Sequence, residues 1–294
     1  MRNVGRARAA AWMCAVGMAA SLLGAHEVAT VEELVAALEA VNGGDADTTV
    51  RIAPGYYDVS GCEMDAKGCL SVQKNVVIEG TDPTSWRETE DRNARVVLDA
   101  KYARSVFNVD PALTGVRFHH LTIQNGTNTN ANLADGAGAG IQHGWYKGKY
   151  AVVSNCVFRN NRAQGQGGGG HTLSVYSCYF TNNVAAEGGA VLSTQATWDS
   201  LFEYNSGTGN GGALRNGGNI RRCVFIGNVS VSGSGGCNYG EGDYVVEDCL
   251  CVSNVATQAG SFGTTFGKQG LSIRNSRFVG NRATATGGQG GALL

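Results

Sequence analysis

The chain has 294 residues, of which 44 are glycine and three are proline, and 43% of the residues are apolar. This apolar fraction argues against a disordered chain, and the glycines follow no collagen-like period of three. The formal net charge is −1 and the lysines and arginines are scattered, which argues against a nucleic-acid-binding protein. The high glycine content instead indicates a fold with many tight turns.

Residues 1–25 are predicted to form a signal peptide. Three arginines within the first eight residues give a positive start, an apolar run covers residues 9–23, and Leu23-Gly24-Ala25 offers small residues for cleavage. A membrane anchor or a core helix is the alternative, but the run is short for a membrane span and rich in alanine. We therefore expect export, a mature chain that begins near His26, and no later segment long enough to cross a bilayer.

Residues 26–44 are predicted to form an N-terminal cap built on one amphipathic helix. Thr30 and Glu33 have the spacing of a capping box, and Gly43-Gly44 is a suitable end. Apolar residues recur between them at helical spacing, at Val31, Leu34, Val35, Leu38 and Val41. Such a helix can cover the first coil of a repetitive β-fold, whose end would otherwise expose unpaired backbone.

Residues 45–149 contain short β-rich runs that are punctuated by glycine, aspartate and asparagine. The runs lie at residues 48–53, 75–80, 95–100, 105–110 and 116–125. We interpret this region as irregular early coils with long loops. Residues 81–93 and the Gly/Asn-rich residues 126–140 are expected to project from the stack of coils.

From residue 150 to residue 294 the chain repeats a unit of 22 to 27 residues. Six copies align on an anchor that is phenylalanine in all copies but one: Phe158, Phe180, Phe202, Phe225, Cys251 and Phe278. A unit this short cannot bury its apolar face alone, whereas stacked copies bury a continuous one. Because the unit has strand character and no helical period, it predicts parallel strands wound into a solenoid, with like residues above one another.

Each copy places the same residue types at fixed distances from the anchor. Cysteine or serine precedes it by two positions and a β-branched residue by five, as expected for inward-facing strand positions. Asparagine tolerates left-handed backbone, and its amide can bond neighbouring backbone groups along the stack. It follows the anchor by three positions in every copy, at Asn161, Asn183, Asn205, Asn228, Asn254 and Asn281.

Glycine pairs are expected to turn the chain into its next strand, because glycine permits positive φ and close backbone approach. We place them at Gly169-Gly170, Gly188-Gly189, Gly211-Gly212, Gly235-Gly236 and Gly290-Gly291, with Gly260 alone in the fifth copy. The sequence stops within a repeat at GGQGGALL, so we expect a longer natural protein or a fragment.

The combination of GGA plus an aliphatic residue with Phe-x-x-Asn resembles the repeat of the chlamydial polymorphic outer membrane proteins. This resemblance covers about residues 150–294, with departures at Cys251, His171 and Cys237. The whole chain looks like the pectin-lyase-like superfamily. The resemblance implies an all-β, right-handed parallel β-helix that is displayed at a cell surface as the passenger of an autotransporter, with a role in adhesion.

Enzymes of the same superfamily, such as polysaccharide lyases and glycoside hydrolases, mount acids and bases on adjacent coils. Asp199, Arg222 and Asp248 stand three positions before successive anchors, so the aspartates could hold a cation or act as acid and base beside a uronate-binding arginine. The position before them carries Arg221, Glu247 and Arg274. We favour a solvated ladder of ion pairs, each worth at most about 1 kcal/mol, because a stacked surface needs alternating charge.

The cysteines and histidines offer weaker candidates. Cys62 and Cys69 bracket a polar loop and are the best disulfide candidate, which would contribute roughly 2.5 kcal/mol. Cys156 and Cys178, like Cys223 and Cys249, are expected to stack as buried thiols, and Cys237 and Cys251 stay unassigned. The histidines match no familiar ligand spacing, so we predict no metal and no cofactor: His119, His120, His143 and His171.

The sequence thus predicts a secreted or surface-displayed parallel β-helix, at the outer membrane of a bacterium or beyond it, whose role is binding or adhesion. Its expected partner is a glycan or protein of a host or another cell surface, and no catalytic residue is named firmly. A carbohydrate-active enzyme on the same scaffold is the alternative, and a structural spacer is a third possibility. The oligomeric state is left open.

Overall fold

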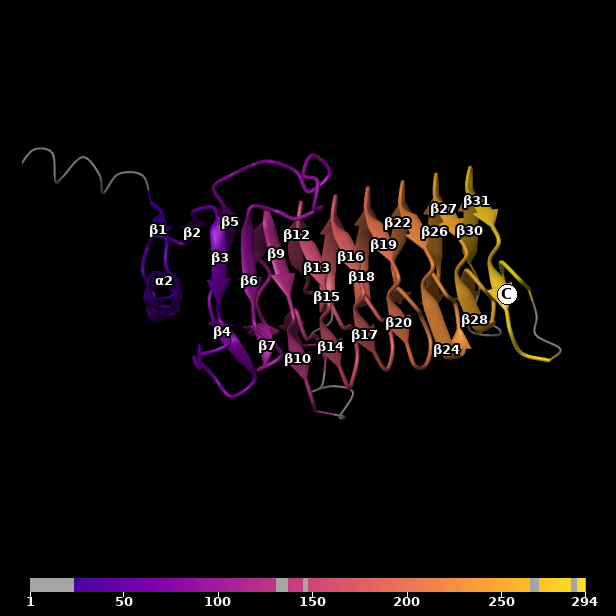
Figure 1. Ribbon diagram of the computed structural model, residues 1–294, viewed down its shortest axis with the longest axis horizontal. Helices are drawn as coiled ribbons and strands as arrows, with labels where there is room; N and C mark the ends of the chain where they lie inside the picture. The colour runs from indigo at the N-terminus through magenta and orange to yellow at the C-terminus, as the bar shows by residue number, and fades with distance from the viewer. Residues whose placement is uncertain (1–23, 131–136, 145–147, 265–269, 287–289, 294) are drawn as a thin grey trace, which may run out of the picture.

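A computed structural model describes residues 24–130, 137–144, 148–264, 270–286 and 290–293. Parallel strands wind through these residues into an elongated solenoid, with the cap helix at the N-terminal end (Figure 1). The prediction of an all-β parallel solenoid with an amphipathic capping helix is therefore confirmed. The predicted signal peptide lies outside the described residues, apart from its last two positions.

The described strands form three sheets, called A, B and C below, and every strand pair is parallel. Sheet A has 16 strands: β1 (His26–Val28), β2 (Thr49–Ile52), β4 (Gly68–Val72), β5 (Val77–Gly80), β7 (Ser105–Val109), β8 (Arg117–His119), β11 (Ile141–His143), β12 (Ala151–Ser154), β15 (Gly170–Tyr176), β18 (Val191–Trp198), β21 (Leu214–Arg215), β22 (Asn219–Arg221), β25 (Asn238–Gly240), β26 (Tyr244–Glu247), β29 (Phe262–Thr264) and β30 (Leu271–Arg274).

Sheet B has nine strands, one from each coil: β3 (Gly55–Asp58), β6 (Val96–Asp99), β9 (Leu121–Gln124), β13 (Val157–Arg159), β16 (Tyr179–Thr181), β19 (Leu201–Glu203), β23 (Val224–Ile226), β27 (Leu250–Val252) and β31 (Arg277–Val279). Sheet C has seven short strands: β10 (Thr127–Asn128), β14 (Arg162–Ala163), β17 (Val184–Ala185), β20 (Ser206–Gly207), β24 (Val229–Ser234), β28 (Val255–Gln258) and β32 (Arg282–Ala283).

The anchor residues stack in register in sheet B, as the repeat predicts. Phe158 pairs with Phe180, Phe180 with Phe202, and Phe202 with Phe225. All four side chains are fully buried, and successive ring centroids lie 4.6, 5.1 and 4.9 Å apart in nearly parallel planes. Burial of each ring contributes on the order of 2 to 3 kcal/mol, so this column is the main core of the regular coils.

The column is interrupted at Cys251, which pairs with Phe225 on one side and Phe278 on the other. Phe262, from β29 at the start of the next coil, fills the space that a phenylalanine ring at the fifth anchor would occupy. Its centroid lies 6.0 Å from that of Phe225 and 5.9 Å from that of Phe278, with both pairs edge to face. A residue outside the anchor position thus completes the core.

The asparagines form a continuous ladder inside the corner between sheets B and C. The amide nitrogen of Asn183 donates to Oδ1 of Asn205 at 3.0 Å and to the carbonyl oxygen of Phe158 at 2.9 Å. The backbone N–H of Asn183 also donates to Oδ1 of Asn205. The same bonds recur from Asn161 to Asn281, and they satisfy polar atoms that are buried in this corner.

The left-handed residue at this corner is the one before each ladder asparagine, which corrects part of the prediction. For example, Asn182 has φ 54° and Tyr204 has φ 55°, whereas Asn183 and Asn205 are not among the residues with positive φ. The ladder asparagine is therefore selected by its hydrogen bonds. The residue before the ladder asparagine adopts the less favourable left-handed backbone of the turn.

The two members of a glycine pair have different tasks. Gly188 has φ 60°, where a side chain would be strained, while a Cβ on Gly189 would lie 2.3 Å from the carbonyl oxygen of Gly212 in the next coil. In the first regular copy these tasks fall to Gly167, with φ 65°, and Gly168. The predicted pair Gly169-Gly170 is therefore wrong by two positions.

This shift also changes the alignment of His171 and of the early loop. His171 pairs with Leu192 and does not occupy the alanine position after the glycines. Ile141 pairs with Gly170, and Gly138 has φ 73°, so residues 138–141 form an earlier copy of the same turn. The predicted projecting loop 126–140 thus ends inside the stack.

The cap helix α2 (Val31–Gly43) has the predicted capping box, in which Thr30 and Glu33 bond each other's backbone N–H groups. Leu34, Ala37, Leu38 and Val41 are buried, and Gly44 ends the helix with φ 99°. The predicted cap of residues 26–44 contains a strand as well as the helix, because residues 26–28 form β1 and pair with β2.

Candidate functional site

The corner between sheets A and B carries the charged column that the sequence singled out. Asp199, Arg222 and Asp248 occupy equivalent corner positions, with φ values of 54°, 49° and 55°. Arg222 and Asp248 are exposed at this corner and Asp199 is half-buried. Arg222 donates from Nε to Oδ1 of Asp199 at 2.7 Å and from Nη2 to Oδ2 at 2.8 Å. The structure therefore joins Asp199 to Arg222, with Asp248 on the following coil.

This pairing limits the chemistry available to Asp199. The hydrogen bonds from Arg222 are the largest cause that lowers the pKa of this carboxyl group, which outweighs the opposing effect of partial burial. An ionised carboxylate with both oxygens occupied has no proton to donate as a general acid near neutral pH. In the adjacent column, Nε of Arg221 lies 3.3 Å from Oε2 of Glu247. The two columns have the geometry of a surface ion-pair ladder.

Residues 81–95, which link β5 to β6, run lengthwise beside the coils (Figure 1). Contrary to the prediction of a projecting loop, they pack on the outer face of sheet B through Trp86. Trp86 is buried and stacks on Tyr179, with ring centroids 5.1 Å apart. Its Nε1–H donates to the carbonyl oxygen of Ser177 at 2.7 Å. Trp86 also covers Val157 and Leu201, so the loop, called the strap below, shields an apolar patch on the outer face of sheet B.

Two arginines extend the strap towards β19. Arg87 lies over the Trp86 ring and donates to the carbonyl oxygen of Asp199. Arg92 forms an ion pair of 3.1 Å with Glu203, whose carboxylate also accepts a 2.7 Å hydrogen bond from the hydroxyl of Tyr179. The strap therefore extends from β6 across β9, β13 and β16 to β19 of sheet B.

The strap was missed as a site by sequence reasoning, which treated these residues as a projecting loop. Two signals were available. Trp86 is a large apolar residue within a polar segment, and Val157, Tyr179 and Leu201 form an apolar column one position before the anchor, where strand alternation places side chains outward. A column of apolar side chains on the outer face of a sheet is expected to be covered by another segment of the chain.

A pocket of about 320 Å³ lies between the strap and sheet B. Arg92 and Asn93 line it from the strap, and Arg159, Thr181 and Asn182 line it from β13, β16 and the following corner. Glu90 and Asp91 of the strap also line the pocket, so its walls combine guanidinium, amide, hydroxyl and carboxylate groups. Such groups suit a polar ligand that offers many hydrogen-bond acceptors and donors, which is the chemistry of a glycan or of a polar peptide segment.

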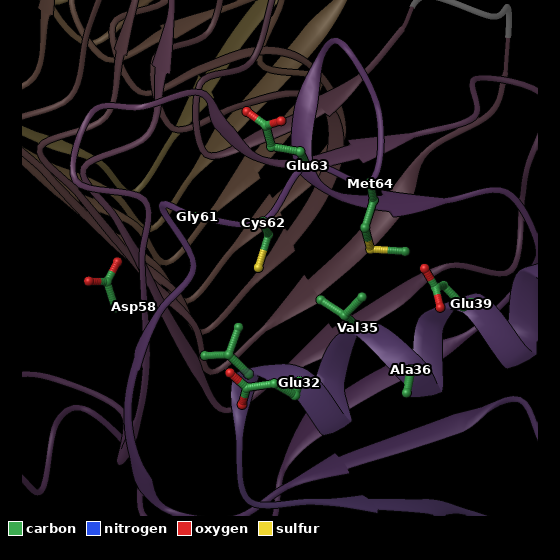
Figure 2. A pocket seen from close by; sticks show the side chains of 10 residues that line it. Glu32, Val35, Ala36, Glu39, Asp58, Gly61, Cys62, Glu63 and Met64 are labelled. Atoms are coloured by element: carbon green, nitrogen blue, oxygen red, sulfur yellow. The ribbon is translucent and has the colours of Figure 1, made fainter.

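A second and larger hollow of about 590 Å³ lies between α2 and residues 58–64 (Figure 2). Its apolar part includes Val31, Val35 and Met64, and carboxylates surround it from Glu32, Glu39, Asp58 and Glu63. Hydrogen bonds from Lys101 and Ser60 lower the pKa of Asp58 to about 2. Arg104 holds Glu63 at 2.8 Å, so part of this negative charge is compensated at the surface.

Cys62 lines the same hollow, and its thiol points towards α2 (Figure 2). Cys62 and Cys69 are both buried and both present as free thiols. Burial raises the pKa of Cys62, and burial together with the nearby Cys62 raises the pKa of Cys69 to about 11. Both groups are protonated at neutral pH in this form. The disulfide between them stays a prediction.

The histidines are placed as structural residues. His143 and His171 are buried in adjacent coils, and Nδ1 of His171 lies 2.8 Å from the carbonyl oxygen of His143. His119 contacts the hydroxyl of Ser154 through Nδ1. The described ranges contain no group of three or more histidine, cysteine or acidic side chains that could hold a metal ion. No helix in the described part of the chain has the length and apolarity needed to cross a membrane.

Comparison with known proteins identifies the type of repeat. The model of the Chlamydia polymorphic membrane protein repeat matches residues 177–194, which include Phe180, Asn183 and the pair Gly188-Gly189. These residues run from the corner before β16 through β17 into β18. No curated protein and no solved structure matches the chain. The chain therefore contains polymorphic-membrane-protein-type repeats within a parallel β-solenoid.

Proposed function

We propose that the protein is exported and displayed at a bacterial cell surface, where it acts as an adhesin-like binding protein. The repeat match at residues 177–194 supports the surface location, because the matching family is one of membrane proteins. The expected ligand is a glycan or protein of a host or a neighbouring cell. A rigid solenoid suits this role because it presents residues of successive coils at fixed spacing.

The observation that carries the proposal is the polar pocket under the strap. The packed sheet holds Arg159, Thr181 and Asn182 on one side, and Trp86 anchors the strap that brings Arg92 and Asn93 to the other. Side chains held in place before binding lose less conformational freedom when a ligand arrives.

The test measures binding of the exported chain to a glycan array and to intact host cells, for wild type and for the double variant Arg159→Ala/Asn182→Gly. Glycine keeps the left-handed backbone of Asn182. We expect at least about a tenfold weaker Kd, equivalent to roughly 1.4 kcal/mol. Arg277→Ala is the matched control, because Arg277 is exposed on β31 of the same sheet, away from the strap. Equal losses in the double variant and the control, or no binding by wild type, would contradict the proposal.

The alternative, a polysaccharide lyase or glycoside hydrolase, rests on the placement of Asp199 and Asp248 on either side of Arg222 in one column. An assay for product release from a panel of acidic polysaccharides separates the two functions. Cleavage by wild type that is lost in Asp199→Asn would favour the enzyme. Cleavage that persists in that variant would remove this column as the site.

A further inference from the structure

The fifth regular coil departs from the repeat at two interior positions at once. Cys251 stands where the other copies have an anchor phenylalanine, and Cys237 stands where Ala190 and Ala213 follow the glycine pair. Both cysteine side chains are fully buried. One departure replaces a large residue with a smaller one, and the other replaces a small residue with a larger one, so the second change offsets part of the volume lost in the first.

These two positions face each other inside the solenoid. Cys237 lies just before β25 of sheet A and Cys251 lies in β27 of sheet B, and both side chains are fully buried in the same core. At Gly169, the equivalent of Ala190 and Cys237 in another coil, an added Cβ would lie 2.9 Å from Cδ1 of the anchor Phe180, so the residue after the glycine pair faces the anchor of its own coil. Phe262 occupies the rest of the vacated ring position, 6.0 Å from the Phe225 centroid. Burial is the largest cause that raises the pKa of Cys251, followed by the thiol of Cys237. In its column Cys251 stands between Phe225 and Phe278, and the Phe262 ring contacts both of these rings.

The remaining cysteines of the regular coils have a different geometry. Cys156 precedes the register pair Val157 with Tyr179, so it stands beside Cys178 on the adjacent parallel strand. Side chains in such positions leave the sheet in the same direction, and their Cβ atoms stay about 4.8 Å apart, beyond the usual 3.5 to 4.5 Å of a disulfide. Cys223 and Cys249 are related in the same way. Side chains from two different sheets, in contrast, point towards each other.

We propose that Cys237 and Cys251 form a disulfide that closes the fifth coil when the exported chain folds in an oxidising compartment. One S–S bond forms and two S–H bonds break. The two protons pass to solvent, and the two electrons reduce the disulfide of a thiol–disulfide oxidoreductase to its dithiol. Because both sulfur atoms are inaccessible once the coil is closed, the exchange takes place before Phe262 is seated. This inference depends on export and is independent of the proposed binding function.

The direct test is a map of disulfides in the chain purified after export. The protein is denatured in iodoacetamide without reductant and digested with chymotrypsin and a glutamate-specific protease. Cleavage after Phe225 separates Cys223 from Cys237, and cleavage after Glu247 separates Cys237 from Cys251. We expect a peptide pair joined through Cys237 and Cys251, with fragment ions that exclude Cys249. Alkylation of both residues, or linkage of either one to Cys223 or Cys249, overturns the proposal.

A second measurement compares thermal melts of Cys237→Ala, which restores the alanine of the other copies, with those of wild type. We expect wild type to melt several degrees higher after export, and the two proteins to melt within about 2 °C of each other after refolding in reductant. Cys223→Ser is the matched control, because Ser200 and Ser276 occupy that column in other copies. Its difference from wild type should not depend on redox conditions. A wild-type melt that is the same with and without reductant overturns the proposal.

Discussion

One asparagine in each of the six regular coils pairs polar atoms that the buried corner between sheets B and C would otherwise leave without partners. Its amide nitrogen bonds one asparagine and one backbone carbonyl, while its Oδ1 accepts from the coil before it. Each unmade bond at a buried site would cost about 1 to 3 kcal/mol. Aspartate or leucine cannot supply the same donor and acceptor together, which explains why all six copies keep asparagine at this position.

Buried histidines make the stability of the solenoid depend on pH. Burial lowers the pKa of His171 to about 4, from an ordinary value near 6.5 in an unfolded chain, and it also lowers that of the neighbouring His143. The unfolded chain therefore binds protons that the folded chain excludes. We expect the free energy of unfolding to fall as the pH drops below about 6.5, by about 3 kcal/mol from His171 by pH 4.

Urea denaturation at pH 7.5, 5.5 and 4.5 measures this effect. His171→Leu is the informative variant, because Leu192 is the register partner of His171 and is itself buried. The variant should lose less stability than wild type between pH 7.5 and pH 4.5. Parallel losses in the two proteins would mean that His171 does not titrate differently on folding.

At the level of single residues, the sequence predicts the positions that recur in every copy. The prediction fails where a copy can be aligned in more than one way. The anchor phenylalanines and the ladder asparagines are found where periodicity puts them, because one geometric constraint acts on all copies. The first glycine pair was placed wrongly since four consecutive glycines, 167–170, offer several alignments. The role of Phe262 could not be foreseen, because it fills the space at Cys251 from outside its own column.

Among the structural elements, the strap is the one that connects distant coils. Trp86 bonds Ser177 and stacks on Tyr179, and Arg92 pairs with Glu203, although more than 90 residues separate each pair along the chain. Most other contacts in a solenoid join one coil to the next. The strap therefore ties the early coils to the regular ones along the outside of sheet B.

We expect Trp86→Ala to release the strap without unfolding the coils. Loss of a buried tryptophan costs about 3 to 5 kcal/mol, which here falls on the contact between strap and sheet. Native-state trypsin cleavage after Arg87 and Arg92 should become roughly a hundredfold to several thousandfold faster, in proportion to the open population. Trp198→Ala is the control, because Trp198 packs against Tyr176 on sheet A. Unchanged cleavage at Arg87 and Arg92 would show that Trp86 does not hold the strap.

The elements were predictable to the extent that hydrophobic pattern determines them. The capping box and the glycine end define α2 from the sequence, and the repeats define the strands after residue 150. The strap was not predictable as a packed element, since its partners lie far away in the sequence and its own residues are mostly polar. Its pocket therefore depends on tertiary contacts that no local pattern reveals.

In the whole molecule the coils form a linear stack, and each coil is stabilised mainly by the coil on either side of it. Sheets A and B run through all the described coils and sheet C joins those from β10 onwards, so in the regular coils backbone hydrogen bonds, ring stacks and the asparagine ladder connect the same pairs of coils. Stability is then a sum of local and nearest-neighbour contributions. A defect in one coil should act mainly on the coils beside it.

Phe202→Ala tests this expectation. The ring is fully buried between Phe180 and Phe225, so its loss should cost roughly 3 to 5 kcal/mol. Hydrogen exchange followed by mass spectrometry should show lost protection in β16, β19 and β23, with protection kept in α2 and β2. The control is Val231→Ala, because Val231 is 60% exposed. A melt without loss of stability, or an even loss along the whole chain, would contradict the one-dimensional description.

The direction of the interstrand bonds has a consequence for a rod that is pulled at its tip. The strands run around the solenoid and their hydrogen bonds run along its length, so tension on the rod would load those bonds end to end and peel the coils apart one at a time. The strap crosses several of these junctions with Trp86 and Arg92 as its attachments. The strap is a second connection between these coils and carries part of the tension beside the interstrand hydrogen bonds. The coils from β6 to β19 should therefore separate at a higher force than the other coils.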